Sequence, residues 1–251
     1  KRVGGQRVLR GFNMIDYVEV EIGGQCIDKH YGDWMNIWTD LTHAQDAETM
    51  LKEMVGLPEF TFTGAAAIDM NKKLYVPLQF WFCRNPGLAL PLIALQYHEV
   101  KLNVEFNSKS NLVYSNGGTA EDTTNEDTKA NVTSANKLYQ NIDSCCVFCD
   151  YIFLDTDERR RFAQVSHEYL IEQVQTSNGA SLTNGGDIEL RFNHPIKELV
   201  WHSGDTASEG AAIDKCLLQL NGHDRFRKRA GSYFTDVQRY EHHTGSGSLS
   251  G

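Results

Sequence analysis

The stretch LYVPLQFWFCRNPGLALPLIALQYHEVKLNVE, residues Leu74 to Glu105, decides the fold that the sequence predicts. From Leu74 to Phe82, apolar residues occupy both alternating sets, so a strand here would be covered on both faces, as in a sandwich. From Gln96 to Phe106, one set is mainly apolar and the other becomes polar, which predicts a strand with one wet face. A turn is expected between them at Arg84 to Gly87, where a proline and a glycine favour the required backbone angles.

Further strands are expected on both sides of this stretch. Ile15 to Ile22 alternates apolar with polar residues and is followed by the turn pair Gly23-Gly24, so its apolar set is expected to face inward. Similar patterns predict four strands in the second half, at His167 to Gln175, Ile188 to Phe192, Ile196 to His202, and Cys216 to Leu220 before the turn Asn221-Gly222. This recurrence of strands and turns favours two similar β domains over one.

Short helices are expected in the connections. Four apolar residues with the spacing of one helix face predict the first helix: Trp34, Ile37, Trp38 and Leu41. Asp33 is placed to cap it, and we expect the stripe to pack against the sheet rather than to stack on a ligand. A second helix is expected from Ala47 to Val55, stopped by Gly56 and Pro58. Asp155 to Glu158 has the form of a capping signal for a third, in which the following arginines are ion-paired and solvated.

Composition and charge set limits on function. The chain has 251 residues, of which 41% are hydrophobic and 23% charged, so it is able to bury a sizeable core. Its net charge of −9 argues against a general nucleic-acid binder, because such proteins use excess Lys and Arg to neutralise phosphates. No apolar run approaches the roughly 20 residues that cross a bilayer. No signal peptide is recognisable, although the chain begins at Lys1 rather than Met.

The six cysteines are scattered, which favours reduced thiols and intracellular synthesis over a disulfide framework. Cys146 and Cys149 have the spacing of a zinc or redox pair. The surrounding segment, Cys145 to Leu154, instead predicts a buried strand in which cysteine acts as a small hydrophobic residue. With no second pair to complete a tetrahedral site, we expect no metal. His242-His243 is likewise not expected to bind metal, because adjacent residues on a strand face opposite sides.

A long polar segment from Asn107 to Asn136 interrupts the strands. Asn, Ser, Thr, Gly, Asp and Glu dominate it, which predicts a long exposed loop. Loops of more than about 15 residues are uncommon inside compact domains and often carry function. Asn131 lies in the sequon Asn-Val-Thr and is a possible glycosylation site, although an unmodified loop is the expectation for a protein made in the cytosol.

The common catalytic and nucleotide-binding motifs are absent from the sequence. It contains no GxSxG, HExxH, P-loop or GxGxxG pattern, and no close pair of carboxylates is implied by position. The basic cluster Arg225 to Arg229 is expected to be a solvated loop or a subunit contact. We therefore predict no enzyme, no catalytic residue and no cofactor.

Several segments together resemble the major capsid proteins of nucleocytoplasmic large DNA viruses. They occur in the same order through nearly the whole chain, which makes the resemblance more specific than a single motif. The segments are Glu21 to Gln25 with Ile27 to Trp34, Leu74 to Lys101, Asp150 to Asp155 with Glu158 to Ala163, His167 to Gln175, and Phe192 to Pro195 with Lys197 to Leu199.

The resemblance implies an all-β fold of two tandem jelly-roll β-sandwiches with short helices in the connections. The first jelly roll is expected in residues 1–155, an interdomain connector in 156–166, and the second jelly roll in 167–251. This chain is shorter than the family pattern. The N-terminal strands of the first roll and the C-terminal strands of the second are expected to be missing, which would leave sheet edges unpaired.

The resemblance also implies a structural protein of an icosahedral large DNA virus. Three chains would form a homotrimer, a pseudo-hexagonal capsomer that tiles the outer capsid shell. The implied partners are neighbouring capsomers and minor capsid proteins, with the inner membrane involved only indirectly and no direct contact with nucleic acid. The implied location is the virion capsid, with synthesis and assembly in virus factories of the host cytoplasm. An alternative is a carbohydrate-binding jelly roll, a lectin-like host-attachment module that stacks aromatic side chains on sugars.

Overall fold

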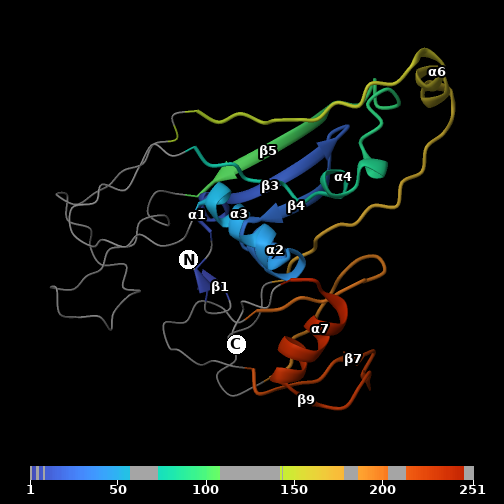
Figure 1. Ribbon diagram of the computed structural model, residues 1–251. Coiled ribbons are helices and arrows are strands. Elements are labelled where there is room, and N and C mark those ends of the chain that lie inside the picture. Colours follow the sequence, from blue (N-terminus) through green and yellow to red (C-terminus); the bar gives the residue numbers. More distant parts are fainter. Residues whose placement is uncertain are drawn as a thin grey trace, which may run out of the picture.

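The fold was analysed in a computed structural model, which describes residues 2–3, 6–7, 9–56, 73–107, 142, 144–177, 186–202 and 213–245. In the first half, a three-stranded antiparallel sheet and several short helices surround one hydrophobic core (Figure 1). In the second half, short hairpins and helices are joined by extended segments. Sheets combined with short helices confirm the coarse fold prediction.

The sheet is built around a central strand with a partner on each edge. Its order is β4-β3-β5, with β3 at Ile15–Ile22, β4 at Gln25–Tyr31 and β5 at Val100–Phe106, and both pairings are antiparallel. Gly23 and Gly24 join β3 to β4 with φ angles of 61° and 84°. These positive angles are the ones that a two-residue hairpin turn requires. The predicted strand and turn are confirmed.

The two faces of the sheet differ as the alternation in the sequence predicts. On β3, Val18 and Val20 are fully buried. Val18 lies opposite Val104, and Val20 lies opposite Leu102. The other face carries the polar set of both strands, so the faces predicted for β3 and β5 are confirmed. The start predicted for β5 is wrong, because residues 92–97 form turns before the strand begins at Val100.

Helices α1 (Arg10–Met14), α2 (Gly32–Thr42) and α3 (Gln45–Val55) lie together beside the sheet (Figure 1). Helix α2 confirms the first predicted helix. Its expected cap is wrong, because the N-cap position is Tyr31 and Asp33 lies inside the first turn. A Cβ on Gly32 would lie 2.1 Å from the carbonyl oxygen of Phe12, so only glycine permits this close approach of α2 to α1.

The buried side of α2 is offset from the predicted tryptophan stripe. Met35 and Thr39 are fully buried and Ile37 is buried, whereas Trp34 and Trp38 are half-buried and stack with ring centroids 5.5 Å apart. Packing against the core, rather than a ligand, therefore accounts for Ile37 and for Leu41, which is partly buried against the core. Helix α2 contacts α1 and the sheet, and Met35, Ile37 and Thr39 are among its buried residues, so the two half-buried tryptophans lie at the margin of the core.

Helix α3 confirms the second predicted helix and its stop signal. Leu51 and Val55 are buried, and Gly56 follows with φ of 95°, the left-handed conformation that commonly ends a helix at glycine. The carbonyl oxygen of Gly56 accepts a hydrogen bond from the backbone N–H of Arg10 at 3.1 Å, which ties the end of α3 to the start of α1.

The strand predicted from Leu74 to Phe82 is wrong. Residues 73–80 are extended but pair with no strand among the described residues, and helix α4 (Trp81–Arg84) follows. Apolar residues in both alternating sets indicate that a segment is buried. A strand also requires a partner strand with which it exchanges backbone hydrogen bonds. The predicted turn is confirmed as the 3-10 helix η1 (Pro86–Leu88), where the Asn85 side chain accepts a hydrogen bond from Gly87 N–H at 2.9 Å.

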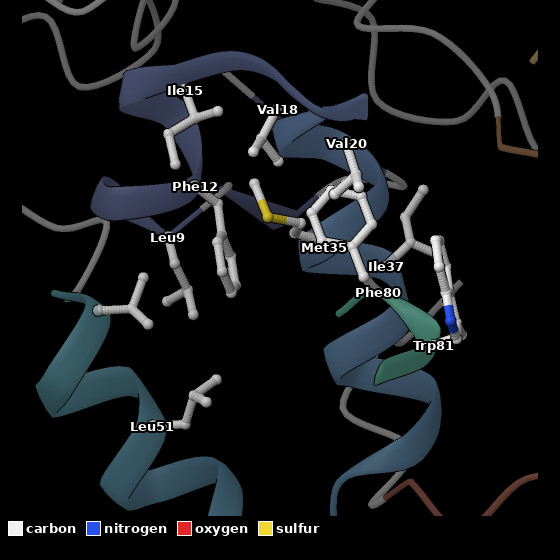
Figure 2. Packing of buried hydrophobic residues seen from close by; sticks show 11 residues of the cluster. Leu9, Phe12, Ile15, Val18, Val20, Met35, Ile37, Leu51, Phe80 and Trp81 are labelled. Atoms are coloured by element: carbon white, nitrogen blue, oxygen red, sulfur yellow. The ribbon is translucent and has the colours of Figure 1, made fainter. Parts of the chain in front are cut away.

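The core joins all these elements. It contains the inner face of the sheet, the buried sides of α1, α2 and α3, and the start of α4 (Figure 2). Phe80 is fully buried although it lies outside a ladder. The members are Leu9, Phe12, Ile15, Val18, Val20, Met35, Ile37, Leu51, Val55, Phe80 and Trp81.

In the second half, two local predictions are confirmed. Helix α6 (Thr156–Gln164) begins with a capping box, in which Asp155 Oδ1 accepts from Glu158 N–H at 2.8 Å and Glu158 returns to the Asp155 backbone. Asn221 and Gly222, with φ of 52° and 78°, form the turn between β7 (Gln219–Leu220) and β8 (His223–Asp224).

The remaining described elements are short. Strands β1 and β2 pair with each other, as do β6 and β9. The chain ends its described part in the π-helix η3 and helix α7. The bounds are β1 Arg2–Val3, β2 Gln6–Arg7, β6 Lys215–Cys216, β9 Arg229–Ala230, η3 Tyr233–Gln238 and α7 Arg239–His242. None of the described helices combines the length and the apolar character that a membrane crossing requires.

Five predicted strands of this half are wrong wholly or in part. Residues 144–154, 167–175 and 186–202 contain no strand, and 215–220 contain two short strands rather than one. The burial expected for Cys145 to Leu154 is also wrong, because the segment lies at the surface. Its apolar pattern has no partner strand or covering layer within the described parts of the chain.

Replacing Met35 by alanine tests the core. Its side chain is fully buried, so Met35→Ala should lower the free energy of unfolding by about 2–5 kcal/mol through lost burial and the resulting cavity. The control is Met50→Ala on α3, whose side chain is 69% exposed and whose loss should cost no more than about 0.5 kcal/mol. Urea denaturation measures both, and equal effects would contradict the assigned core.

Candidate assembly surfaces

The residues singled out by the sequence do not form a chemical centre. Asn131 lies outside the described residues. Cys146 and Cys149 are exposed free thiols, and the described residues contain no group of three or more side chains suited to hold a metal ion. The strand expected at His242-His243 is wrong, because His242 is the last residue of helix α7. His243 Nε2 lies 2.6 Å from Glu198 Oε1. The surfaces of the chain are therefore its candidate functional features.

The first surface is the apolar segment, which we define as residues 144–154. Large apolar side chains protrude from it, with Phe148 at 82% and Phe153 at 92% exposure. Val147, Tyr151 and Ile152 are also exposed. Such a run is unusual on the free surface of a protein and marks a site that another surface covers.

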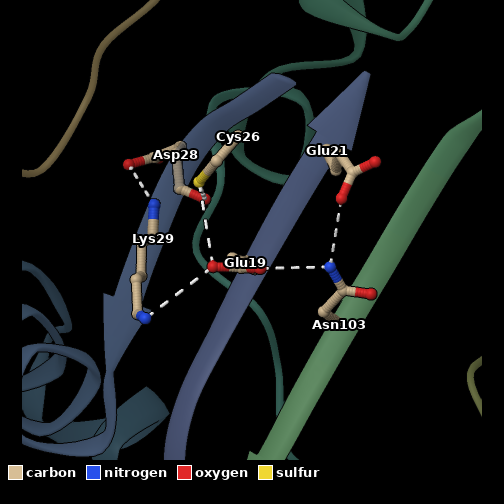
Figure 3. Close-up of polar contacts among 6 residues, drawn as sticks. All are labelled: Glu19, Glu21, Cys26, Asp28, Lys29 and Asn103. Carbon is tan, nitrogen blue, oxygen red and sulfur yellow. Dashed lines mark hydrogen bonds and ion pairs between the residues drawn. The ribbon is translucent and has the colours of Figure 1, made fainter. Parts of the chain in front are cut away.

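The second surface is the polar outer face of the sheet, where Glu19 lies at the centre (Figure 3). One Glu19 oxygen accepts a hydrogen bond from Asn103 Nδ2 at 3.0 Å, and the other lies 3.7 Å from Lys29 Nζ. Asn103 also reaches Glu21, and Cys26 Sγ donates to Glu19 at 3.8 Å. Burial, with the negative charge and hydrogen bond of Glu19, raises the pKa of Cys26. These contacts span all three strands and fix the side chains of this face.

The same face continues toward Tyr17 and Glu105, which are paired across β3 and β5. A hydrogen bond to Glu105 raises the pKa of Tyr17 to about 12, because loss of the phenolic proton would place a second negative charge beside the carboxylate. Lys29 Nζ lies 3.3 Å from the centre of the Tyr17 ring. The outer face is therefore a continuous polar surface with opposite charges interleaved.

The third surface is a seam between the two halves, formed by the docked segment, which we define as residues 171–175. The Val174 backbone N–H donates to Asp28 Oδ1 at 2.9 Å, and the Gln173 side chain donates to the carbonyl oxygen of Ile27. Glu172 Oε2 lies 3.1 Å from Arg84 Nη2, and its other oxygen pairs with Lys197. The hydrogen bond from Lys197, together with the charges of Lys197 and Arg84, lowers the pKa of Glu172.

A second contact between the halves lies at the end of α2. The Arg239 guanidinium donates to the carbonyl oxygen of Asp40 at 3.0 Å, and Thr244 Oγ1 donates to that of Thr42 at 2.8 Å. Gly245 N–H donates to Leu41, and a Cβ on Gly245 would lie 2.1 Å from the oxygen of Asp40. The free carbonyl groups at this helix end are thus satisfied by the second half.

The predicted basic clusters lie at the surface. Arg159, Arg160 and Arg161 are exposed on α6, and Arg160 pairs with Asp157 at 3.6 Å, as expected for that turn. In the cluster from Arg225 to Arg229, the Arg229 guanidinium lies 4.0 Å from the centre of the Tyr233 ring. The cluster is exposed, which agrees with a loop or a contact surface.

Antiparallel strands, short helices and exposed contact surfaces place the chain in the class of β-sheet proteins with helical connections. Comparison with known families then identifies the particular one. A profile described as major capsid protein N-terminus matches residues 7–155, and a profile described as large eukaryotic DNA virus major capsid protein matches residues 158–211. The chain belongs to the major capsid protein family of large eukaryotic DNA viruses, which confirms the resemblance found in the sequence.

Individual relatives agree. The major capsid protein of Pyramimonas orientalis virus is 48% identical over 238 residues, which cover 93% of this chain and 54% of that protein. The major capsid protein of Paramecium bursaria Chlorella virus 1 is 36% identical over 281 residues, covering 95% of this chain and 60% of that protein. In the quasi-atomic structure of the PBCV-1 virus capsid, the matching chain has a TM-score of 0.64 at 34% identity, with 95% of this chain and 63% of that chain covered.

The chain covers only part of each relative that it matches. The chain spans about half the length of the curated relatives that it matches most strongly. The relatives therefore possess segments that have no counterpart among the residues described here.

The paired Glu172 predicts a pH-dependent contribution to stability. Because its folded-state pKa lies below the ordinary value of 4.5, the contribution is present above that pH and is lost as pH falls through the folded-state pKa. Glu172→Gln should therefore lower the free energy of unfolding at pH 7 by at most about 1 kcal/mol, since the side chain is 42% exposed. The difference from the unaltered chain should shrink as the pH is lowered below 4.5.

Chemical denaturation at a series of pH values measures this difference. Glu189→Gln is the matched control, because Glu189 pairs with Arg191 in a much more exposed setting. A loss for Glu172→Gln that stays constant down to pH 3 would show that the pairing with Lys197 and Arg84 does not cause it.

The apolar segment yields a second prediction. Replacing Tyr151 and Phe153 by serine should reduce self-association and binding of an apolar dye, because both side chains are exposed. The midpoint of thermal unfolding should stay within about 2 °C, because exposed side chains contribute little to stability. Light scattering and calorimetry measure the two quantities. A large fall in the midpoint would mean that the segment is part of the folded core.

Proposed function

We propose that this chain is part of the building block of an icosahedral shell of a large DNA virus, in which three copies form a pseudo-hexagonal capsomer. The observation that carries the proposal is the match of two capsid-protein profiles, in order, to the two halves of the chain. The boundary between the matches falls at the capped start of α6. The 48% identity to the major capsid protein of Pyramimonas orientalis virus supports it independently.

The proposal extends to the domain plan. Residues 1–155 form the first jelly roll, 156–166 the connector and 167–251 the second jelly roll, both incomplete. The three-stranded sheet with its core then belongs to the first roll, and the hairpins β6–β9 and β7–β8 belong to the second. The exposed apolar segment supports incompleteness, because a run of large apolar side chains at a surface marks a place that another layer covers.

In such a shell the protein acts through complementary surfaces rather than catalysis. Contacts repeated by symmetry allow many weak interfaces to add up to a stable assembly. The polar outer face, the apolar segment and the basic cluster supply different chemistries for contacts within a trimer, with neighbouring capsomers and with minor capsid proteins. The net charge of −9 makes direct nucleic-acid contact unfavourable. The family resemblance implies that the inner membrane is only an indirect neighbour. The protein would reside in the virion capsid after assembly in the host cytoplasm.

A chimera tests this proposal. The matched region of the Pyramimonas orientalis virus protein is replaced by this chain, so that the flanking segments of the relative are present. The chimera should form a stable trimer, measured by analytical ultracentrifugation, with a hexagonal outline in electron micrographs. The unaltered relative is the control. A folded chimera that stays monomeric and binds to a glycan array would overturn the capsomer proposal in favour of a carbohydrate-binding module.

A further inference from the structure

Strand β4 carries a buried pair of ionisable side chains that the proposed function does not use. Asp28 and His30 are 3% and 1% exposed, and His30 Nε2 lies 2.9 Å from Asp28 Oδ2. They are two residues apart, so both side chains lie on the same face of the strand. The His30 ring stacks on Phe80 with ring centroids 4.4 Å apart, which fixes its position.

The pair is costly as a means of stabilising the core. Across the ladder it faces Val18 and Val20, which are apolar and fully buried. Burial of charged groups costs several kcal/mol per ion, and an apolar pair of similar volume is often equally or more stable. Among the described residues, neither ring nitrogen of His30 has a hydrogen-bond partner, and nor does Asp28 Oδ2, so the close contact between them is not an aligned hydrogen bond. A role other than stability is therefore needed to account for the pair.

The other carboxylate oxygen of Asp28, Oδ1, indicates a role in holding a distant segment of the chain. Asp28 Oδ1 accepts hydrogen bonds from the backbone N–H groups of Lys29 and Val174, each at 2.9 Å. Next to it, the Gln173 side chain donates to the carbonyl oxygen of Ile27. The outer edge of β4 thus receives the docked segment through a carboxylate that is held in place by His30, and not through a strand ladder.

The docked segment in turn contacts later parts of the chain. Gln175 exchanges two hydrogen bonds with the backbone of Asn193, at 2.9 and 3.2 Å. Glu172 pairs with Lys197 and with Arg84, and Ile171 packs against the first-half core. The position of residues 171–175 therefore affects residues 193–197 directly.

We propose that Asp28 and His30 form a latch that fixes the docked segment, and with it the second half of the chain, against the edge of β4. The His30 ring, fixed by stacking on Phe80, supports Asp28 from the core side at 2.9 Å, and Asp28 holds the Val174 amide. The other charged groups nearby are accounted for: Lys29 points to Glu19 on the polar outer face. Arg84 and Lys197 both pair with Glu172. The latch does not depend on the shell assembly proposed above.

Hydrogen exchange of the Val174 amide tests the latch, because this amide is the group that Asp28 holds. In the unaltered chain it should be protected. Asp28→Asn keeps a hydrogen-bond acceptor but removes the negative charge. In this variant the protection of the Val174 amide against exchange should fall on the order of tenfold, as expected when a charge-assisted hydrogen bond is lost. Glu21→Gln, a carboxylate-to-amide change on the opposite face of the same sheet, should leave the protection unchanged.

The double variant Asp28→Val with His30→Phe separates docking from stability. An apolar pair restores the core, so protection of the β3–β5 ladder should be retained or increased, while the Val174 amide should exchange as in an undocked segment. This outcome supports the latch even where the single variants do not fold. Full protection of Val174 in the double variant would overturn the proposal. So would simultaneous loss of the ladder and Val174 protection, because the pair would then be a general core element.

Discussion

The double pairing of β3 is the constraint on which the rest of the described structure depends. Because β4 occupies one edge and β5 the other, each residue of β3 is committed to one face, and a register slip would turn Val18 and Val20 outward. The inner face then specifies where α1, α2 and the start of α4 pack, and the outer face brings Glu19, Asn103 and Lys29 together. Both the core and the polar surface are consequences of a single register.

Features encoded by neighbouring residues could be predicted from the sequence. The strand from Ile15 to Ile22, the stop of α3 at Gly56, the capping box of Asp155 and the Asn221-Gly222 turn each depend on signals within a few positions. The strands expected at 74–82 and 145–154 were predicted wrongly for the opposite reason. A strand depends on a partner far away in sequence, and apolar alternation shows only that a segment requires cover.

The contacts at the seam between the two halves could not be predicted from the sequence for a related reason. Asp28 and His30 lie within a segment that carries the family resemblance, yet alternation does not indicate that charged residues on β4 are buried. The only local signal is their spacing of two. The partners that give them a role, Val174 and Phe80, are brought in by tertiary structure. Glu172 is a similar case, because its partners Arg84 and Lys197 come from two other segments.

Rigidity at this seam affects the proposed assembly. Association of subunits has to offset the entropy lost when mobile parts become ordered, so a building block whose halves are already fixed requires less from each interface. In a shell, this smaller loss of entropy on association applies to every copy of the protein. A carboxylate buried at the seam is also more selective than an apolar contact, because an alternative register would leave Asp28 and His30 without partners. Burying this pair costs free energy, but it restricts the two halves to a single relative position. An apolar seam of equal stability would specify that position less strictly.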